Sequence, residues 1–382
     1  MNIAFFLDAK LIKKENIYYT SGAATKEYLN RHRYSEQDKL IVICREESSE
    51  NVTMSQLSIA SDENITFLTC HSYKDVWKER KQIEKIIKQS DLIHIKLPTI
   101  IGLLAMHYAI KYKTEHVVQM VGCPFDSLWN YGNLKGKILA PILYLANRHY
   151  LKRAKNVIYV TNEFLQKRYP TEGKSISCSD VNIEEAKEET IQKRLNKIRD
   201  KEGSYKIGLI GSLNVNYKGH KEAIEAISLL KDKYNIELHF LGKGNTEKWK
   251  QLAKKLKVEN NVFFDGILPS GKPVFKWLDE LDIYLIPSLQ EGLPRALIEA
   301  MSRGCPSIGT KTGGIPELLQ KEYICPKRDY KEIANKIRKL CTNKEEMLRI
   351  ANENYVKIKE QYNKEILNER RNKFLANFRE RR

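Results

Sequence analysis

The 382-residue sequence lacks several features that assign a chain to a class at once. Its seven cysteines never form a CxxC pair, which argues against a disulfide framework and against a zinc site. No stretch approaches eighteen uninterrupted apolar residues, so we expect no membrane-spanning helix. The early apolar run Ile3–Leu7 is too short for the core of a signal peptide. We therefore expect a protein of the reducing cytoplasm.

Acidic residues are scarce relative to basic ones. The chain has 48 Asp and Glu against 66 Lys and Arg, a formal net charge of +18. Such an excess indicates an anionic partner, and nucleic acid, an anionic membrane surface and phosphorylated substrates are all candidates. None of the usual nucleic-acid recognition signatures is present, so we expect no nucleic-acid partner.

Both halves alternate short apolar runs rich in β-branched residues with longer amphipathic stretches. Runs of this kind are typical of strands buried on both faces, and the alternation predicts two doubly wound parallel α/β sheets. The predicted strands are Ile3–Leu7, Leu40–Cys44, Ile65–Leu68, Leu92–Ile95, Val117–Val121, Asn156–Val160, Ile207–Ile210, Ile236–Leu241, Val262–Phe264, Ile283–Ile286 and Ser307–Gly309. We expect one domain over 1–170, a second over 204–361, and a charged connection over 171–203. The chain after Lys331 should be almost wholly helical.

The segment Pro287–Leu319 carries the strongest chemical signal. Pro294 precedes a predicted short helix, Arg295–Arg303, whose free N–H groups could bind phosphate. Glu291 lies in the loop before that helix and Glu299 inside it, so one carboxylate could reach sugar hydroxyls and the other the ribose. Taken singly, each glutamate is as well explained by a solvated side chain.

Together, EGLPRALIEAM from Glu291 and the following GTKTGGIPELL closely resemble the family 4 retaining glycosyltransferases of GT-B fold. The resemblance covers roughly Tyr205–Leu319. It implies two Rossmann-like domains facing a cleft, with a C-terminal helix over about 362–382 returning to the first domain. It also implies a nucleotide-sugar donor, an acceptor bound by the first domain, and retention at the anomeric carbon. By the resemblance, Glu291 and the amides of Gly292 and Leu293 face the donor sugar, and Glu299 holds the ribose.

The loop GSLNVNYKGH after Ile210 matches the family at its Lys-Gly pair, Lys218 and Gly219. Lys218 could neutralise the charge of a leaving diphosphate beside Gly211, or it could be a solvated loop lysine. Ser212 stands where the family commonly has an arginine, and Arg295 is the candidate replacement. Ile267, in VFFDGIL, is the candidate contact to the base, although core packing explains it equally well.

In the first half the resemblance is thinner. Gly22 precedes a helix and matches a glycine loop that the family places beside the donor phosphates and the acceptor; a tight turn is the alternative. In GCPFDSLWNYG many family members carry a histidine, and Asp126 is the nearest ionisable residue here. Asp126 could act as a carboxylate base on the acceptor hydroxyl, or it could cap the following helix. No two aspartates stand two positions apart, so we expect a donor site without a metal or other cofactor.

The stretch Leu128–Lys155 has six Lys or Arg and no acidic residue, interleaved with apolar and aromatic side chains. Such a helix suits an anionic membrane surface, although a core-packed helix with a solvated basic face is equally possible. The next segment, VTNEFLQKRYP, resembles bacterial glycosyltransferases of capsule and surface polysaccharide synthesis, which often use lipid-linked acceptors. We therefore expect a cytoplasmic enzyme that can lie on the inner face of the membrane. The alternatives are a catalytically inactive GT-B partner subunit and, less favoured, a basic nucleic-acid-binding protein.

Overall fold

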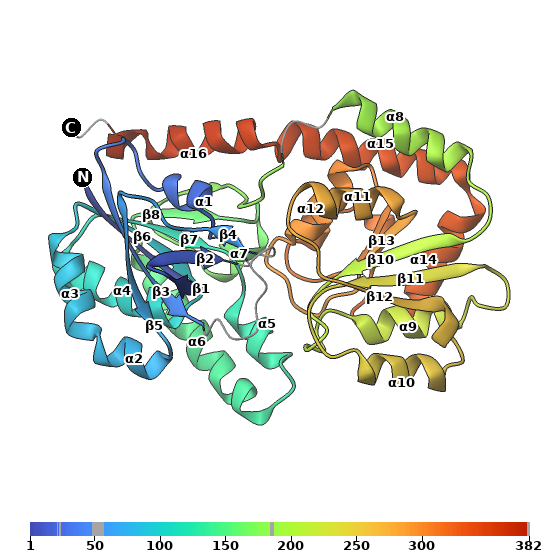
Figure 1. The fold of residues 1–382 in the computed structure, drawn as a ribbon, viewed down its shortest axis with the longest axis horizontal. Coiled ribbons are helices and arrows are strands. Elements are labelled where there is room, and N and C mark those ends of the chain that lie inside the picture. The colour runs from blue at the N-terminus through green and yellow to red at the C-terminus, as the bar shows by residue number, and fades with distance from the viewer. Residues whose placement is uncertain (21, 23, 48–56, 184–186, 380–382) are drawn as a thin grey trace. The chain divides into compact units, whose positions relative to one another are not determined.

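The computed structural model describes residues 1–382 except 21, 23, 48–56, 184–186 and 380–382 (Figure 1). The chain divides into two compact units, each with its own sheet. The first unit contains Met1–Pro124, Pro141–Cys178 and Leu375–Arg382, and the second contains Phe125–Ala140 and Ser179–Phe374.

The sheet of the first unit has the parallel order β5-β3-β1-β6-β7-β8-β9. This is the Rossmann order with a seventh strand added at one edge. The end of β1 also pairs in antiparallel fashion with β2, which in turn pairs with β4. The strands are β1 (Asn2–Lys14), β2 (Ile17–Thr20), β3 (Lys39–Glu46), β4 (Ser58–Ile59), β5 (Ile65–Cys70), β6 (Leu92–Leu97), β7 (His116–Met120), β8 (Asn156–Tyr159) and β9 (Lys174–Ser177).

Helices connect these strands and end at recognisable caps. Thr99 begins α4 by accepting a hydrogen bond from the Gly102 amide at 2.8 Å, and Lys113 ends it in a left-handed conformation with φ of 53°. The helices of this part are α1 (Lys26–Asn30), α2 (Tyr73–Lys78), α3 (Arg80–Gln89), α4 (Ile100–Tyr112) and α7 (Phe164–Arg168). The division between the units falls after the first residue of α5 (Pro124–Trp129) and inside α6 (Leu134–Arg153), between Ala140 and Pro141.

The sheet of the second unit has the order β12-β11-β10-β13-β14-β15, and every strand pair is parallel. All four residues of β13 are buried, as expected for a strand covered on both faces. The strands are β10 (Tyr205–Ile210), β11 (Ile236–Leu241), β12 (Val262–Gly266), β13 (Ile283–Ile286), β14 (Ser307–Thr310) and β15 (Ile324–Cys325).

The helices of the second unit pack on both faces of its sheet, and Figure 1 shows α8 lying along α15. The α-helices are α8 (Glu188–Arg199), α9 (His220–Ser228), α10 (Glu247–Lys255), α11 (Lys272–Glu280), α12 (Arg295–Ser302), α13 (Ile315–Leu318), α14 (Tyr330–Thr342), α15 (Lys344–Gln361) and α16 (Lys364–Arg379), whose end belongs to the first unit. Short 3₁₀ turns lie at Glu259–Asn261 and Lys321–Tyr323.

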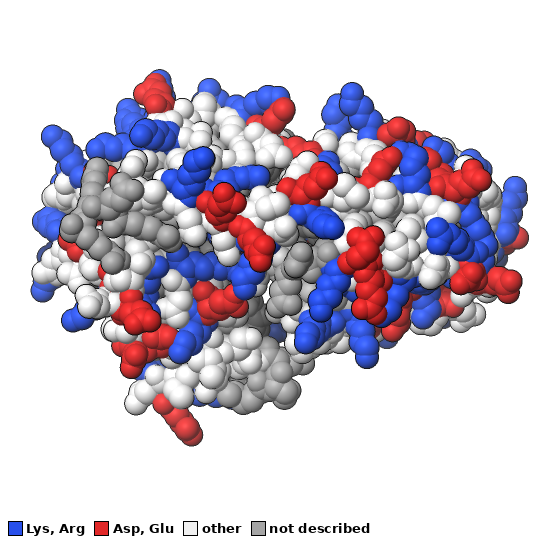
Figure 2. Space-filling view, turned by 90° about the horizontal axis from the view of Figure 1, so that it is seen from above, with Lys and Arg blue, Asp and Glu red and all other residues white. Residues whose placement is uncertain are grey.

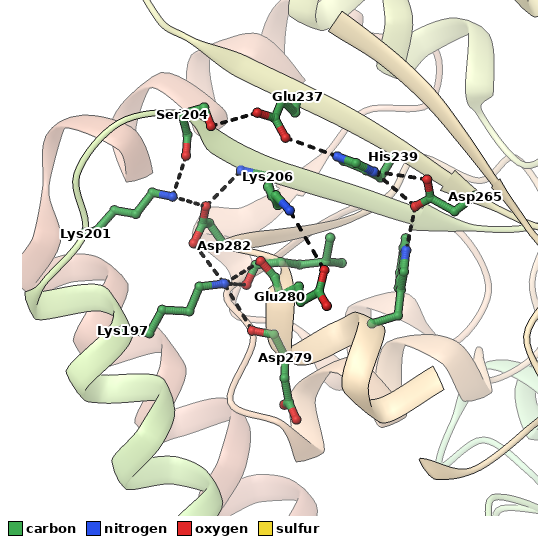
Figure 3. Close-up of polar contacts among 12 residues, drawn as sticks. Lys197, Lys201, Ser204, Lys206, Glu237, His239, Asp265, Asp279, Glu280 and Asp282 are labelled. Carbon is green, nitrogen blue, oxygen red and sulfur yellow. Dashed lines mark hydrogen bonds and ion pairs between the residues drawn. The ribbon is translucent and has the colours of Figure 1, made fainter. Parts of the chain in front are cut away.

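An ion-pair network fastens α8 to the amino end of β13 (Figure 3). The buried carboxylate of Asp282 contacts Lys197 Nζ at 3.2 Å and Lys201 Nζ at 2.6 Å. The same carboxylate accepts the Lys206 amide at 2.8 Å. Three partners satisfy this buried charge, so α8 is an integral part of the second unit.

The expectation of two doubly wound sheets is confirmed, and every predicted strand is present. The first, expected over Ile3–Leu7, continues to Lys14, where its end pairs with β2. Within the segment expected as connection, Lys174–Ser177 forms β9 and extends the first sheet. This strand is half-exposed, so it lacks the apolar run that marks the others. On the face shown in Figure 2, Lys and Arg are spread over the surface and interspersed with Asp and Glu.

Candidate functional site

Three glycines at the carboxyl ends of β10, β11 and β12 hold the following loops together. The Gly211 amide donates to the Leu241 carbonyl at 3.0 Å, and the Gly242 amide donates to the Gly266 carbonyl at 2.7 Å. A Cβ atom on Gly242 would lie 2.0 Å from the carbonyl oxygen of Gly211, so no larger residue fits there. The loops therefore meet backbone to backbone at the edge where α/β sheets bind ligands.

Lys218 and Glu291, from the loops after β10 and β13, form an ion pair. Lys218 Nζ donates to Glu291 Oε1 at 2.7 Å, and the two side chains are 25% and 10% exposed. The stem of Lys218 lies across Gly211, because a Cβ atom added there would be 3.1 Å from Lys218 Cγ. The main chains of the two loops are also joined, since the Leu289 amide donates to the Tyr217 carbonyl at 2.7 Å. The structure thus brings together two of the residues for which the sequence predicts catalytic roles.

The backbone around Gly292 is fixed by the glycine pair that follows β14. Gly313 has a φ of 54°, and a Cβ atom on it would lie 2.2 Å from the Glu291 carbonyl oxygen. The Gly314 amide donates to the Gly292 carbonyl at 2.7 Å. This turn accepts only glycine and sets the course of the main chain into Leu293, so the amides of Gly292 and Leu293 are held in one orientation.

The helix α12 begins directly after Pro294, and within the described residues no side-chain hydrogen bond caps its amino end. Its first amides and the positive end of its dipole therefore remain available at the loop of Glu291. Arg295 is exposed at this end, and Glu299 is half-buried one turn further on. Burial raises the pKa of the Glu299 carboxyl, and the charge of Arg295 opposes that rise.

Tyr284 is a residue of this site that the sequence analysis missed. It is fully buried in β13, and its hydroxyl group lies close to the backbone of Ile210. Burial raises the pKa of the Tyr284 phenol well above its usual range, and the charges of Glu291 and Glu299 raise it further. The hydroxyl is therefore within electrostatic reach of both carboxylates. Inside the apolar run IYLI, a tyrosine gives no signal beyond core packing.

Ile267, the candidate contact to a base, is 47% exposed directly after Gly266. The preceding Asp265 accepts a hydrogen bond from Trp277 Nε1 at 2.6 Å and pairs with His239 Nδ1 at 3.0 Å (Figure 3). These contacts hold the turn that carries Ile267. No sequence motif marks His239 or Trp277, which lie 26 and 12 residues away from Asp265 along the chain.

The other predicted site residues lie apart from these contacts. Ser212 is exposed beside Gly211, with its Oγ 3.4 Å from the Lys243 carbonyl. Gly22 belongs to the first unit, where its amide donates to Thr20 Oγ1 at 3.0 Å. Asp126 lies in the first turn of α5 rather than at the position that would cap it, and it is 8% exposed. The roles of all three remain predictions.

The helix α6 exposes an unusual number of large apolar side chains. Those of this region that are at least 46% exposed are Trp129, Tyr131, Leu134, Ile138, Leu139, Ile142 and Leu145. The six basic residues expected here are all exposed as well: Lys135, Lys137, Arg148, Lys152, Arg153 and Lys155. Soluble surfaces seldom combine this much exposed apolar area in one place.

Within the described parts of the chain, the search for a cluster of three or more His, Cys, Asp and Glu side chains able to hold a metal ion finds none. The described helices likewise include none with the length and hydropathy needed to span a bilayer.

Known proteins resemble this chain both over its second half and over its full length. The model of the family described as glycosyl transferases group 1 matches residues 204–343, which include every residue of the Lys218–Glu291 region. Protein CapJ of Staphylococcus aureus is 34% identical over 388 aligned residues, covering 99% of this chain and 96% of CapJ. The putative colanic acid biosynthesis glycosyltransferase WcaL of Escherichia coli is 29% identical over 40% of each chain.

Among solved structures, HepE of Anabaena in complex with UDP and glucose has a TM-score of 0.70 and 15% sequence identity. The similarity covers 98% of this chain and 99% of HepE, and at this identity it concerns the fold. The two Rossmann-like sheets, the matched family model and the full-length similarity to CapJ lead to one assignment: the chain belongs to the group 1 glycosyltransferases and is a family-4-like glycosyltransferase of GT-B fold.

Proposed function

We propose that this enzyme transfers a sugar, with retention, from a nucleoside diphosphate sugar to a lipid-linked saccharide during synthesis of a capsule or another surface polysaccharide. The observation that carries the proposal is the Lys218–Glu291 ion pair, 2.7 Å long, among glycine loops and beside the free amino end of α12. Colanic acid biosynthesis, in the name of WcaL, supports the polysaccharide class. The UDP and glucose bound in HepE support a nucleotide-sugar donor.

In this proposal the second unit binds the donor. The Lys218 ammonium and the amino end of α12 neutralise the diphosphate, whose charge increases as the glycosidic bond breaks. Arg295, exposed at the start of α12, supplies the cation that Ser212 does not. Glu291 accepts hydrogen bonds from hydroxyl groups of the donor sugar, and the amides of Gly292 and Leu293 donate hydrogen bonds to the oxygen atoms of that sugar. Glu299 holds the ribose, Gly211 borders the phosphates, and Ile267 packs on the base. Transfer needs no further cofactor.

The acceptor is assigned to the first unit. Gly22 follows β2, which runs antiparallel to the end of β1, and an acceptor could approach the main chain there. Asp126, in the segment Phe125–Ala140 that groups with the second unit, is proposed as the carboxylate that orients or deprotonates the acceptor hydroxyl. A buried position close to the start of a helix suits this role, since Asp126 is 8% exposed.

The α6 region supports an acceptor at a membrane. Its exposed apolar side chains can enter the interface of a bilayer, and its exposed Lys and Arg can pair with anionic headgroups. Each cation close to an anionic leaflet contributes roughly 1 kcal/mol. The proposal therefore places the enzyme in the cytoplasm, reversibly attached to the inner face of the membrane.

A thermal-shift screen of nucleoside diphosphates and their sugars tests the donor assignment. A ligand present at about 100 times its Kd stabilises the folded state by about 2.7 kcal/mol, so the true donor should raise the melting temperature clearly. The Lys218→Ala and Glu299→Ala variants should lose most of that rise, while Arg338→Ala, at an exposed position on α14, should keep it. If no nucleotide sugar shifts the wild-type melting temperature, the proposed function is wrong.

Liposome co-sedimentation tests the membrane assignment. Wild type should sediment with anionic vesicles and not with neutral ones, and salt should release it because the Debye length falls from about 10 Å at 0.1 M to about 3 Å at 1 M. The test variant changes Lys135, Lys137, Arg148, Lys152, Arg153 and Lys155 to Gln. The control variant makes the same change at six exposed lysines of the second unit: Lys250, Lys254, Lys255, Lys276, Lys321 and Lys331. Equal sedimentation of the two variants would contradict a specific role for α6.

A further inference from the structure

A cavity of about 490 Å³ lies in the second unit at the start of α9, and none of its lining residues is among those assigned to the donor. It is bordered by the β10–α9 loop, by α9 and α10, and by the turn that leads into α14. The side chains that matter for its chemistry are Asn216, Glu222, Glu225, Trp249, Arg328 and Tyr330.

Glu222 supplies the cavity with an unsatisfied acceptor. The residue is 6% exposed, and its Oε2 atom makes no hydrogen bond in the described part of the chain. A buried carboxyl oxygen without a partner is unfavourable, so it marks a place where a bound molecule can supply a donor. Burial also raises the pKa of the Glu222 carboxyl, while its own backbone amide and the charges of Lys221 and Arg328 oppose that rise.

Arg328 supplies the complementary donor, and its backbone is held in a conformation that favours glycine. Its φ is 64°, in the left-handed region, within the turn between β15 and α14. The turn is fixed on its other side by Asp329, whose Oδ1 accepts the Glu332 amide at 3.0 Å and so begins α14. The guanidinium makes no hydrogen bond or ion pair with any described residue, although its charge acts on Glu222. The guanidinium is therefore a donor that a bound molecule can satisfy.

The balance of charge around the cavity selects the class of ligand. Two carboxylates, Glu222 and Glu225, face two cations, Lys221 and Arg328, and the Lys221 ammonium lies 3.6 Å from Glu225. An anion would meet the carboxylates and a cation would meet Arg328, so neither is favoured. A neutral molecule with several adjacent hydroxyl groups can donate to Glu222 and accept from Arg328 at once.

Aromatic side chains complete this picture. Trp249 and Tyr330 contribute to the walls, and Trp249 is held in place because its Nε1 donates to the Leu213 carbonyl at 3.0 Å. Tyr330 is only partly buried, so the apolar C–H face of a sugar ring can pack on it while the hydroxyl groups reach polar atoms at the rim. Trp249 is 5% exposed and stacks on His220, so it supports the wall from the core side. Carboxyl, guanidinium, amide and aromatic groups in one cavity of this size fit one saccharide ring.

We propose that this cavity is a saccharide-binding subsite, separate from the donor site, that holds a sugar of the acceptor or product glycan; the proposal rests on the proposed function. Two of its walls connect it to the donor loops. Asn216 is two residues before Lys218, and Leu289 is two residues before Glu291. The hydrogen bond between the Leu289 amide and the Tyr217 carbonyl joins those two segments. A bound glycan therefore steadies the loops that position the ion pair.

Saturation-transfer NMR on the full chain tests the subsite, with UDP present to occupy the donor site. The probes are maltotriose, cellotriose and chitotriose, and inorganic phosphate serves as the anionic competitor. The main variant is Arg328→Gly, which removes the guanidinium while relieving the backbone, so that loss of binding cannot be ascribed to unfolding. Lys257→Gly is the matched control, since Lys257 also has a positive φ, 56°, and lies outside the cavity. Glu222→Gln is the second variant.

At least one trisaccharide should bind wild type and the Lys257→Gly variant alike, and Arg328→Gly should weaken it about tenfold or more. Glu222→Gln should also weaken it, and phosphate should not compete. Absence of binding by all three probes, equal binding by Arg328→Gly, or displacement by phosphate would overturn the proposal. The thermal shift given by nucleotides is measured in parallel. A wild type that responds to nucleotides but shows no Arg328-dependent sugar binding leaves the proposed function standing and refutes the subsite alone.

Discussion

The Lys218–Glu291 ion pair should make the enzyme distinguish its donor from the nucleoside diphosphate that remains after transfer. In the free protein each side chain satisfies the other at 2.7 Å. A diphosphate that binds Lys218 draws the ammonium away from Glu291. The buried Glu291 carboxylate is then left beside added negative charge. A nucleotide sugar compensates, because its sugar hydroxyls can donate to the carboxylate. The product nucleotide offers no such donor.

The size of this effect follows from the geometry. A phosphate that takes the Lys218 ammonium from Glu291 stays about 6 Å from the carboxylate, and at an effective dielectric constant of about 20 the two anions repel by about 3 kcal/mol. Because Lys218 is 25% exposed, solvent reduces this repulsion. We therefore expect Glu291→Gln to strengthen binding of the nucleoside diphosphate by about 1.5 kcal/mol, or roughly tenfold. The same change should weaken binding of the nucleotide sugar, because each hydrogen bond from the sugar to the charged carboxylate contributes about 1.5–3 kcal/mol.

Isothermal titration calorimetry with UDP and UDP-glucose, or with the pair selected by the thermal-shift screen, measures both affinities. The matched control is Glu299→Gln, a carboxylate of α12 that makes no ion pair with Lys218 in the described structure. The control variant should lower the affinities for the nucleotide and for the nucleotide sugar by the same factor, because both ligands contain the ribose. If Glu291→Gln weakens both ligands equally, or leaves the diphosphate unchanged, the idea of a shared ammonium is wrong.

Three further outcomes follow from the structure. Glu299→Ala should raise the KM for the donor with little change in kcat, because the ribose is held alike in ground and transition states, and steady-state kinetics will show it. Gly219→Ala should destabilise the fold by more than about 2 kcal/mol in urea titrations, because Gly219 has a φ of 82° and a Cβ would lie 2.3 Å from the Pro287 carbonyl oxygen. The control, Gly203→Ala with a φ of 72° and open space around it, should lose only about 1 kcal/mol. Burial alone would lower the pKa of His239, but Asp265 and Glu237 raise it above its usual 6.5. The stabilisation it gives is therefore complete below pH 6.5 and lost as pH rises through the raised value, so the melting temperatures of wild type and His239→Gln should converge at alkaline pH.

The two sheets could be predicted because strands buried on both faces need continuous apolar residues, which a sequence displays directly. Ile283–Ile286 is such a strand, and all its residues are buried. The strands that escaped prediction are short or half-exposed. Lys174–Ser177 lies at a sheet edge with two residues exposed, and Ile324–Cys325 has only two residues. Their pairing depends on a neighbouring strand rather than on their own composition.

Individual residues of the candidate site could be predicted from the sequence, but the contacts between their side chains could not. Lys218 and Glu291 each follow a predicted strand, and parallel strands bring their carboxyl ends to one edge. That the two side chains meet, across 73 residues of sequence, depends on loop geometry that no local pattern encodes. Tyr284 was missed for the opposite reason. Its position inside an apolar strand is what core packing alone would give, and only the structure relates its hydroxyl to Glu291 and Glu299.

The character of α6 shows where sequence leaves two outcomes open. A helix with basic and apolar residues can bury its apolar side chains in the core or expose them to a membrane, and composition is the same in both cases. The structure shows that these apolar side chains are not in the core, because Leu134, Ile138, Ile142 and Leu145 are more than half exposed, and contact with a membrane stays a proposal. Residues three and four apart share one side of a helix, so these four form a continuous stripe.

The donor loops combine a rigid backbone with a movable pair of charges. Gly242 and Gly313 hold the main chain through approaches to backbone oxygen atoms that leave no room for a Cβ, so the amides proposed to face a donor are in place before it binds. Preorganised donors of this kind lower the entropy lost on binding and strengthen electrostatic stabilisation of the transition state. The Lys218–Glu291 pair, in contrast, must open when the diphosphate enters. A ligand therefore binds well when its phosphate pairs with Lys218 and its sugar hydroxyls donate to Glu291. A ligand that has the phosphate but not the sugar leaves the buried charge of Glu291 uncompensated.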